Sequence, residues 1–171
     1  MLEAIKTRRS IREFDLNKKV SYDDLLSLCK AASFAPSARN QKDKEYIIID
    51  DEKVIEKLVD ISKGSAILKN SNTVIAIVGK DPNSLTTPDM EGVDLAAATE
   101  NILLEATNMH LASCWVGVYP NEERMKKGNE ILNIKDNKFL FSLIAIGYPL
   151  NDDIFHEIDK FDLNDIHHNK Y

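Results

Sequence analysis

The amino-acid sequence predicts a fold of the α/β or α+β class, in which helices pack against a β-sheet. Short apolar runs typical of strands alternate with segments of helical period along the chain of 171 residues. This length suits one domain, 1–171, with enough chain to bury a substantial apolar core. The final stretch, 149–171, is acidic and poor in aliphatic residues, and we expect it to form a tail.

The first clearly marked helix follows Ser21. Ser21 is a good N-cap residue and Asp24 occupies the third helical position, a combination that favours helix initiation. Pro36 ends the segment, because proline cannot continue a helix. The apolar stripe consists of Leu25, Leu28, Cys29 and Ala32.

The middle of the chain supplies a strand, a helix and a second strand. Tyr46–Ile49 is predicted to be a short buried strand, and Thr73–Val78 is a β-branched run that suits a strand covered on both faces. The helix between them is expected to stop at Gly64, since glycine is common just after helix ends. Its inner face would consist of Val54, Leu58 and Ile61.

Glu91–Leu111 is the longest predicted helix, and it is apolar almost all round. A helix of this kind is buried, and its Ala96–Ala98 cluster would allow close approach of another helix, in the same domain or in a partner subunit. Two more apolar strands, Cys114–Val118 and Phe139–Ile146, are separated by a helix with Asn121 as its N-cap.

Charge and composition exclude several classes of partner. The formal net charge of −6 gives no general attraction for nucleic acid or anionic membranes. No apolar run approaches the roughly 20 residues that span a bilayer, and the charged first nine residues do not resemble a secretory leader. Cys29 and Cys114 lie in apolar patterns, as expected of reduced thiols in the cytoplasm.

The densest chemical signal is Arg8–Arg9–Ser10–Ile11–Arg12, which places three guanidinium groups and a hydroxyl within five residues. A guanidinium offers a planar fork of donors that matches phosphate oxygens, and it stays charged at any working pH. This segment is therefore where an anionic ligand would bind. Taken alone, it favours a simpler interpretation, a solvated basic segment paired with Glu3, Glu13 or Asp15.

Two other segments carry features of a ligand site. Ala35–Gln41 is a predicted loop in which Ser37 and Asn40 offer donors and acceptors for the edge of a heterocycle, although both are also ordinary turn residues. Trp115–Val116–Gly117 contains a glycine inside a strand, which often marks close approach of a backbone or ligand. Trp115 itself is equally compatible with a role in the core.

Together these segments resemble the nitroreductase family of flavoproteins, and the resemblance covers nearly the whole chain in the right order. Each segment alone is a weak signal, but their agreement in order is specific. They are Arg8–Phe14, Ala31–Gln41, Asp94–Ala106, Cys114–Gly117 with Ile146–Pro149, and the terminus Ile166–Tyr171.

The resemblance implies an α+β fold, with a mainly antiparallel central sheet flanked by helices. It implies a homodimer in which the C-terminal tail extends over the partner subunit. It also implies bound FMN, NADH or NADPH as electron donor, and a small oxidised acceptor such as a nitroaromatic or a quinone, reduced by a ping-pong route. No catalytic side chain is expected, because the flavin carries the chemistry.

The resemblance further assigns residues to the flavin. Arg8, Arg9 and Ser10 would hold its phosphate and ribityl chain, and Arg12 would approach the pyrimidine end of the ring. Trp115, Val116 and Gly117 would lie at the reactive edge. The partner subunit would contribute Pro36, Ser37, Ala38 and Asn40.

The chain departs from the family pattern in two places. Gln41 leads into Lys42–Asp43–Lys44, whereas many relatives continue with Pro–Trp, so the loop near the active site is altered. After the turn that ends at Pro149 the chain is acidic, which leaves Lys160 as the nearby cation to complete the phosphate site.

Three alternatives are weighed against the flavoenzyme. The altered loop is compatible with a flavin carrier or sensor that lacks efficient turnover. A nucleic-acid module using the arginines is disfavoured by the acidic balance and by the lack of an aromatic stacking platform. A metal site built from His156, His167 and His168 lacks completing Cys or carboxylate ligands, so we expect no metal.

Overall fold

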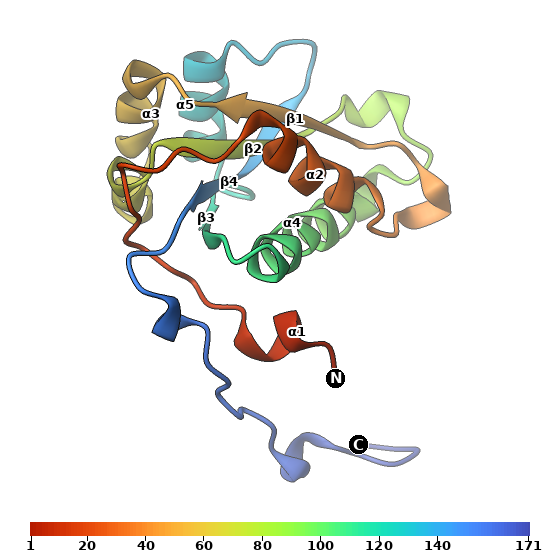
Figure 1. Ribbon diagram of the computed structural model, residues 1–171. Helices are drawn as coiled ribbons and strands as arrows, with labels where there is room; N and C mark the ends of the chain where they lie inside the picture. Colours follow the sequence, from red (N-terminus) through yellow and green to blue (C-terminus); the bar gives the residue numbers. More distant parts are fainter.

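The computed structural model describes residues 1–171, except for the side chain of Asp152. At its centre lies a four-stranded sheet in the order β1-β2-β4-β3 (Figure 1). All three strand pairs are antiparallel, which confirms the α+β class and excludes α/β. The strands are β1 (Lys44–Ile49), β2 (Thr73–Gly79), β3 (Ala112–Gly117) and β4 (Phe139–Gly147).

Helices cover both faces of this sheet, and α1 stands apart from it (Figure 1). Two separate apolar cores result, one beneath α2 and α4 and the other beneath α3 and α5. The central strand β2 serves both cores and is buried throughout, as its β-branched sequence predicts. The helices are α1 (Glu3–Thr7), α2 (Tyr22–Ser33), α3 (Glu52–Val59), α4 (Glu91–Asn108) and α5 (Glu122–Leu132).

The predicted helix starts at Ser21 and Asn121 are confirmed, whereas the predicted end at Gly64 is wrong. The side chains of Ser21 and Asn121 accept the capping N–H bonds of α2 and α5 at 3.1 and 3.0 Å. By contrast, α3 ends at Val59, and Gly64 lies within a 3-10 helix, Lys63–Asn70. The reason is that Ser62 forms its own capping box and starts this second helical segment.

The helix α4 crosses one face of the sheet and is buried on that face only. It ends at Asn108, three residues earlier than predicted, because His110 adopts a left-handed φ of 56° and turns the chain into β3. Leu95, Ala98 and Ile102 are fully buried, whereas Val93 is 60% exposed. The expectation of burial all round is therefore not met within one chain.

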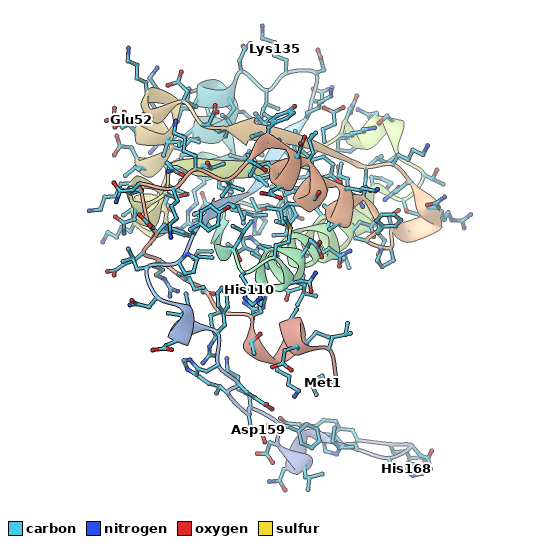
Figure 2. All side chains as sticks on the ribbon, in the orientation of Figure 1. Met1, Glu52, His110, Lys135, Asp159 and His168 are labelled. Atoms are coloured by element: carbon cyan, nitrogen blue, oxygen red, sulfur yellow. The ribbon has the colours of Figure 1, made fainter. Side chains whose placement is uncertain are left out.

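The two ends of the chain leave the body of the protein together. Phe14 pairs with Pro149, and Ser10 still pairs with Ser113 of the sheet. Before Ser10, α1 contributes no buried residue. Residues 156–171 are all exposed. Figure 1 shows both termini on the same side, and in Figure 2 Asp159 and His168 lie on the part of the tail that extends away from the body.

Candidate functional site

The arginine segment lies along the open edge of the sheet. β3 is an edge strand, and Ser10 forms a parallel bridge with Ser113 of β3, with the N–H of Ile11 donating to the carbonyl of Ser113 at 2.9 Å. This pairing uses backbone groups of an otherwise free edge and fixes the direction of the segment. The three arginines are therefore held by the sheet rather than carried on a free N-terminal arm.

A cavity of about 340 Å³ lies beside this segment. Its walls are residues 9–13 on one side and Leu150, Asn151, Ile154 and His156 on the other. Arg9, Arg12 and His156 supply basic groups, and Glu13 is the acidic residue in this wall. The chemistry of the wall suits an anion with several oxygens, because guanidinium groups donate in pairs to such groups.

Each arginine has a definite partner. Arg8 Nε lies 3.1 Å from Glu100 of α4, and Arg12 donates to the carbonyl of Ser10 at 3.0 Å. Arg9 Nη2 lies 3.0 Å from His156 Nε2. None of these partners is Glu3, Glu13 or Asp15, the acids considered from the sequence; Glu3 and Asp15 pair with Lys6 and Lys18 instead.

The positive charge of Arg12 affects the thiol of Cys114 in β3. Burial raises the pKa of the Cys114 thiol, while the Arg12 guanidinium lowers it. Since Cys114 lies in β3, this opposing effect places the positive charge of Arg12 close to the same sheet edge. The guanidinium thus provides a fixed positive potential at this edge.

The end of β3 is open and exposed at Gly117. A Cβ built at Gly117 would meet no atom within 4 Å, and Arg124 donates to its carbonyl at 3.3 Å. Val116 is buried in the core beneath α3 and α5, so only its backbone faces this edge. Trp115 is half-buried and packs on Phe141, with ring centroids 6.2 Å apart, which matches the alternative role as a core aromatic.

The loop after α2 is held in shape by partly or fully buried hydrogen bonds. Ser37 donates to the carbonyl of Gln41 at 2.8 Å, which closes the loop on itself. The N–H of Ala38 donates to both carboxylate oxygens of Asp94 at 3.0 Å, and the side chain of Gln41 donates to Asp94 at 3.0 Å. Asn40 adopts a left-handed φ of 54°, a conformation that asparagine tolerates well. Pro36 precedes these contacts at an exposed position.

Asp94 was not among the site residues predicted from the sequence. It lies 56 residues from Ala38, so no local pattern connects the two. The available signal was an acid in the first turn of a helix that is otherwise apolar, at a position that the structure buries. A buried carboxylate requires hydrogen-bond donors, and the loop provides them.

Two more carboxyl groups lie near Asp94. The pKa of Glu91 is raised to about 7, chiefly by burial and further by the nearby charges of Asp43 and Asp94. The backbone N–H of Lys80 donates to the Glu91 carboxylate at 2.8 Å and partly offsets this rise. Burial also raises the pKa of Asp43, and Lys44 opposes this with its Nζ 3.3 Å away. The loop is therefore attached to α4 through Asp94, and the buried carboxyl groups of Asp43 and Glu91 lie close to this attachment.

The loop and the arginine segment contact different parts of α4. The loop binds Asp94 and the arginine segment binds Glu100, six residues further along. At 1.5 Å and 100° per residue, the two contacts are separated by about 9 Å along the helix and by about 120° around it. Figure 1 accordingly shows the loop at the start of α4 and α1 below its other end. Within one chain the two groups of predicted site residues do not converge.

The start of the tail completes one wall of the cavity. His110, labelled in Figure 2 between the body and α1, lies edge-on to Phe155 with ring centroids 6.1 Å apart. This contact brings His156 to the cavity, whereas Lys160 lies in the exposed tail beyond it. His156 was considered from the sequence only as a metal ligand or tail residue.

The described residues lack two features that other classes of protein carry. They contain no group of three or more His, Cys, Asp or Glu side chains that could hold a metal ion. They also contain no helix of the length and apolarity needed to cross a membrane.

Known proteins resemble this chain over most of its length. The model of the family described as "Nitroreductase family" matches residues 5–72 and 63–148. A protein of Archaeoglobus fulgidus named "Putative NADH dehydrogenase/NAD(P)H nitroreductase" is 39% identical over 172 residues, covering 99% of this chain and 98% of that protein.

Solved structures agree with these sequence matches. "Putative NADH Oxidase" from Clostridium acetobutylicum is 40% identical with a TM-score of 0.92, covering 98% of this chain and 99% of the other. "FMN-dependent Nitroreductase" from Clostridium difficile R20291 is 27% identical with a TM-score of 0.89, covering both chains fully. Since the family model matches residues 5–148 and a relative that is 39% identical covers 99% of the chain, the chain belongs to the nitroreductase family.

Proposed function

We propose that this protein is an FMN-dependent oxidoreductase that takes electrons from NADH or NADPH and passes them to a small oxidised acceptor, such as a nitroaromatic or a quinone, by a ping-pong route. The observation that carries the proposal is the arginine-lined cavity beside the segment that pairs with Ser113 of β3. The open position at Gly117 lies four residues further along the same strand. The names of the relatives, which include NAD(P)H nitroreductase and FMN-dependent nitroreductase, support it.

The residues present fit FMN. Its phosphate needs hydrogen-bond donors, and Arg9 and Ser10 line a cavity of about 340 Å³. We assign Arg8, the preceding residue, to the phosphate as well, although in one chain it is paired with Glu100. Its ring needs a flat approach to backbone, which the open position at Gly117 allows. Bound FMN would supply hydride and electron transfer, so that no acid–base pair of the protein is required.

The protein's own residues bind and orient this group. The backbone of Val116 and Gly117 lies at the sheet edge that we assign to the reactive side of the ring, with Trp115 packed beneath it. Arg12 provides positive charge at the pyrimidine side, where negative charge develops on reduction, and thereby favours the reduced form.

We further propose that the active unit is a homodimer. The loop residues Pro36, Ser37, Ala38 and Asn40 would line the ring bound by the other subunit, which is supported by their separation from the arginine segment within one chain. Exposed apolar side chains of α1 and of the tail also support a partner subunit: Ile5 is 51% exposed, Phe161 68% and Leu163 75%. Side chains of this kind are stabilised by burial against another surface.

In this proposal the whole chain, 1–171, acts as one domain, and residues 149–171 pack on the partner subunit. We place it in the cytoplasm, which the two free cysteines support.

The proposal is tested by absorption spectroscopy. The purified protein, or the apoprotein after incubation with FMN, should show a flavin spectrum that NADH or NADPH bleaches in the absence of oxygen. A nitroaromatic or a quinone added afterwards should restore the oxidised spectrum. Initial rates at varied donor and acceptor should give parallel double-reciprocal lines. A protein that stays colourless with FMN would contradict the proposal.

A second candidate is a flavin carrier or sensor, motivated by the altered sequence Lys42–Asp43–Lys44. In the structure Asp43 is fully buried and Lys44 forms an ion pair with it. The altered sequence therefore places a buried ion pair at the base of the loop. Flavin that binds tightly but is not reduced by either nicotinamide within minutes would favour the carrier. Reduction and reoxidation over many cycles would exclude it.

A further inference from the structure

The structure contains a hydrogen-bonded pair that joins the arginine segment to the tail. Arg9 Nη2 lies 3.0 Å from His156 Nε2, and His156 Nδ1 lies 3.1 Å from the carbonyl oxygen of Asp153. A guanidinium can only donate and a carbonyl can only accept. Nε2 must therefore accept from Arg9, and Nδ1 must carry the proton that is donated to Asp153. In this arrangement His156 is neutral.

The pair is positioned where a ligand would separate it. Arg9 and His156 belong to opposite walls of the same cavity. An anion in the cavity would accept the N–H groups of Arg9 in place of His156. The lone pair on Nε2 would then face the oxygens of the anion, which is repulsive unless Nε2 gains a proton and becomes a donor.

We infer that His156 is the titratable ligand of a phosphate monoester in this cavity, and that it takes up a proton from solvent when the phosphate binds. The inference rests on the proposed function, in which that monoester is the phosphate of FMN. One N–H···N bond, from Arg9 to His156, is exchanged for two bonds to phosphate oxygens, one from Arg9 and one from Nε2–H. The imidazolium also adds a positive charge.

The surrounding charges favour this exchange only when an anion is present. On the arginine segment, Arg9 and Arg12 oppose a charged imidazole and Glu13 favours it. On its own segment His156 is flanked by Asp153 and by Glu157, and Glu157 is paired with Lys6 of α1 at 3.6 Å. Phosphate, as a dianion, adds the negative charge that stabilises the protonated ring.

The location of His156 distinguishes it from Lys160. His156 lines the cavity, whereas Lys160 lies four residues further along the exposed tail. The cation that completes the phosphate site is therefore one whose charge depends on pH. When a ligand binds only to the protonated form of a group that is neutral in the free protein, its dissociation constant rises by up to about tenfold for each unit of increase in pH.

The experiment compares the dissociation constants of FMN and riboflavin, measured by flavin fluorescence between pH 7 and pH 9. Riboflavin lacks the phosphate, so the ratio of the two constants isolates the phosphate contribution. The second ionisation of a phosphate monoester lies near pH 6, so it is almost complete throughout this range. The proteins are wild type, His156→Gln, His156→Lys and the control Lys160→Gln, each checked for an unchanged melting curve.

For the wild type and for Lys160→Gln, we expect the preference for FMN over riboflavin to fall about tenfold or more from pH 7 to pH 9. His156→Lys should keep the preference high and nearly constant, because lysine stays charged in this range. His156→Gln should show about a tenfold weaker preference at pH 7, equal to the wild type at pH 9. Calorimetry in buffers of different ionisation enthalpy should show proton uptake with FMN in the wild type and in Lys160→Gln, but not in the two His156 variants.

A pH-independent preference that His156→Gln leaves unchanged would overturn the inference while leaving the proposed function intact. Loss of the preference in Lys160→Gln alone would assign the site to Lys160 and overturn it equally. If no form of the protein binds FMN at any pH, the proposed function fails together with the inference.

Discussion

The backbone N–H of Ala38 donates to both carboxylate oxygens of Asp94, each at 3.0 Å, across 56 residues of sequence. Through this contact the first turn of α4 determines where the loop 36–41 lies. Since the loop is proposed to line the flavin of the other subunit, Asp94 acts as a positioning residue for a site that it does not touch.

Replacing Asp94 with alanine should destabilise the protein and weaken flavin retention. The N–H of Ala38 and the side-chain amide of Gln41 would lose their acceptor, at a cost of about 1–3 kcal/mol. Asp94→Asn keeps one acceptor oxygen and should lose less. Urea unfolding and FMN titration would measure both effects, with the exposed Asp89→Ala as control. Equal behaviour of Asp94→Ala and Asp89→Ala would show that the anchor is unimportant.

The raised pKa of Glu91 should appear in the pH dependence of stability. Its folded pKa of about 7 exceeds the ordinary value of 4.5, so the folded state binds more protons between these values. The contribution of Glu91 to stability therefore falls as pH rises from about 4.5 through about 7. Glu91→Gln should remove this loss and gain about 1–3 kcal/mol relative to wild type at pH 8, but not at pH 5.

Urea unfolding of both proteins at the two pH values would measure this difference. The exposed Glu56→Gln serves as control and should show no such change. A difference between wild type and Glu91→Gln that is the same at pH 5 and pH 8 would mean that the carboxyl is ionised throughout.

Arg8→Ala should weaken FMN binding by about tenfold to a hundredfold, since it removes a charge-assisted hydrogen bond worth about 1.5–3 kcal/mol. Riboflavin binding should change little. Glu100→Gln provides the matched comparison, because it frees Arg8 from its 3.1 Å ion pair without removing it, and should leave FMN binding equal or tighter. Unchanged FMN affinity in Arg8→Ala would place the phosphate elsewhere.

Deleting Asp159–Tyr171 should weaken dimerisation or flavin retention. All of these residues are exposed in one chain, so their apolar side chains have no role in its two cores. Analytical ultracentrifugation and the flavin-to-protein ratio would report the effect. A truncated protein that sediments as a dimer and keeps its flavin would contradict the proposed role of the tail.

Substitution of alanine at two glycines should affect different properties, FMN affinity at Gly117 and folding stability at Gly79. At Gly117 a Cβ meets no atom within 4 Å, so Gly117→Ala should leave the unfolding of the apoprotein unchanged while lowering FMN affinity. At Gly79 a Cβ would lie 2.5 Å from the ring of Phe139, so Gly79→Ala should destabilise the apoprotein. Undiminished FMN binding by Gly117→Ala would exclude close contact between the ring and this position.

Features encoded by neighbouring residues were predictable from the sequence. The caps at Ser21 and Asn121 are examples, since each depends on a contact within three residues. The burial of β2 was predictable because its run of β-branched residues has no polar alternation. Gly64 misled the prediction because Ser62, two residues earlier, nucleates a separate helical segment.

The features that depend on contacts distant in sequence could not be predicted from local pattern. Nothing in the sequence around Arg9 indicates that His156 would accept its hydrogen bond, 147 residues away. The same holds for Arg8, whose partner Glu100 lies on α4, beyond two strands and two α-helices of intervening chain. The chemical types of the site residues were visible in the sequence, but their partners were set by the tertiary fold.

The placement of the loop and the arginine segment against different faces of α4 has a genetic consequence. In the proposed dimer each flavin would draw on the arginines of one polypeptide and the loop of the other. A subunit altered at Arg8 and a subunit altered at Asp94, each inactive by itself, would form a mixed dimer in which both lesions fall in one site and the other site is intact. Two defective alleles expressed together should therefore restore part of the activity that neither provides alone.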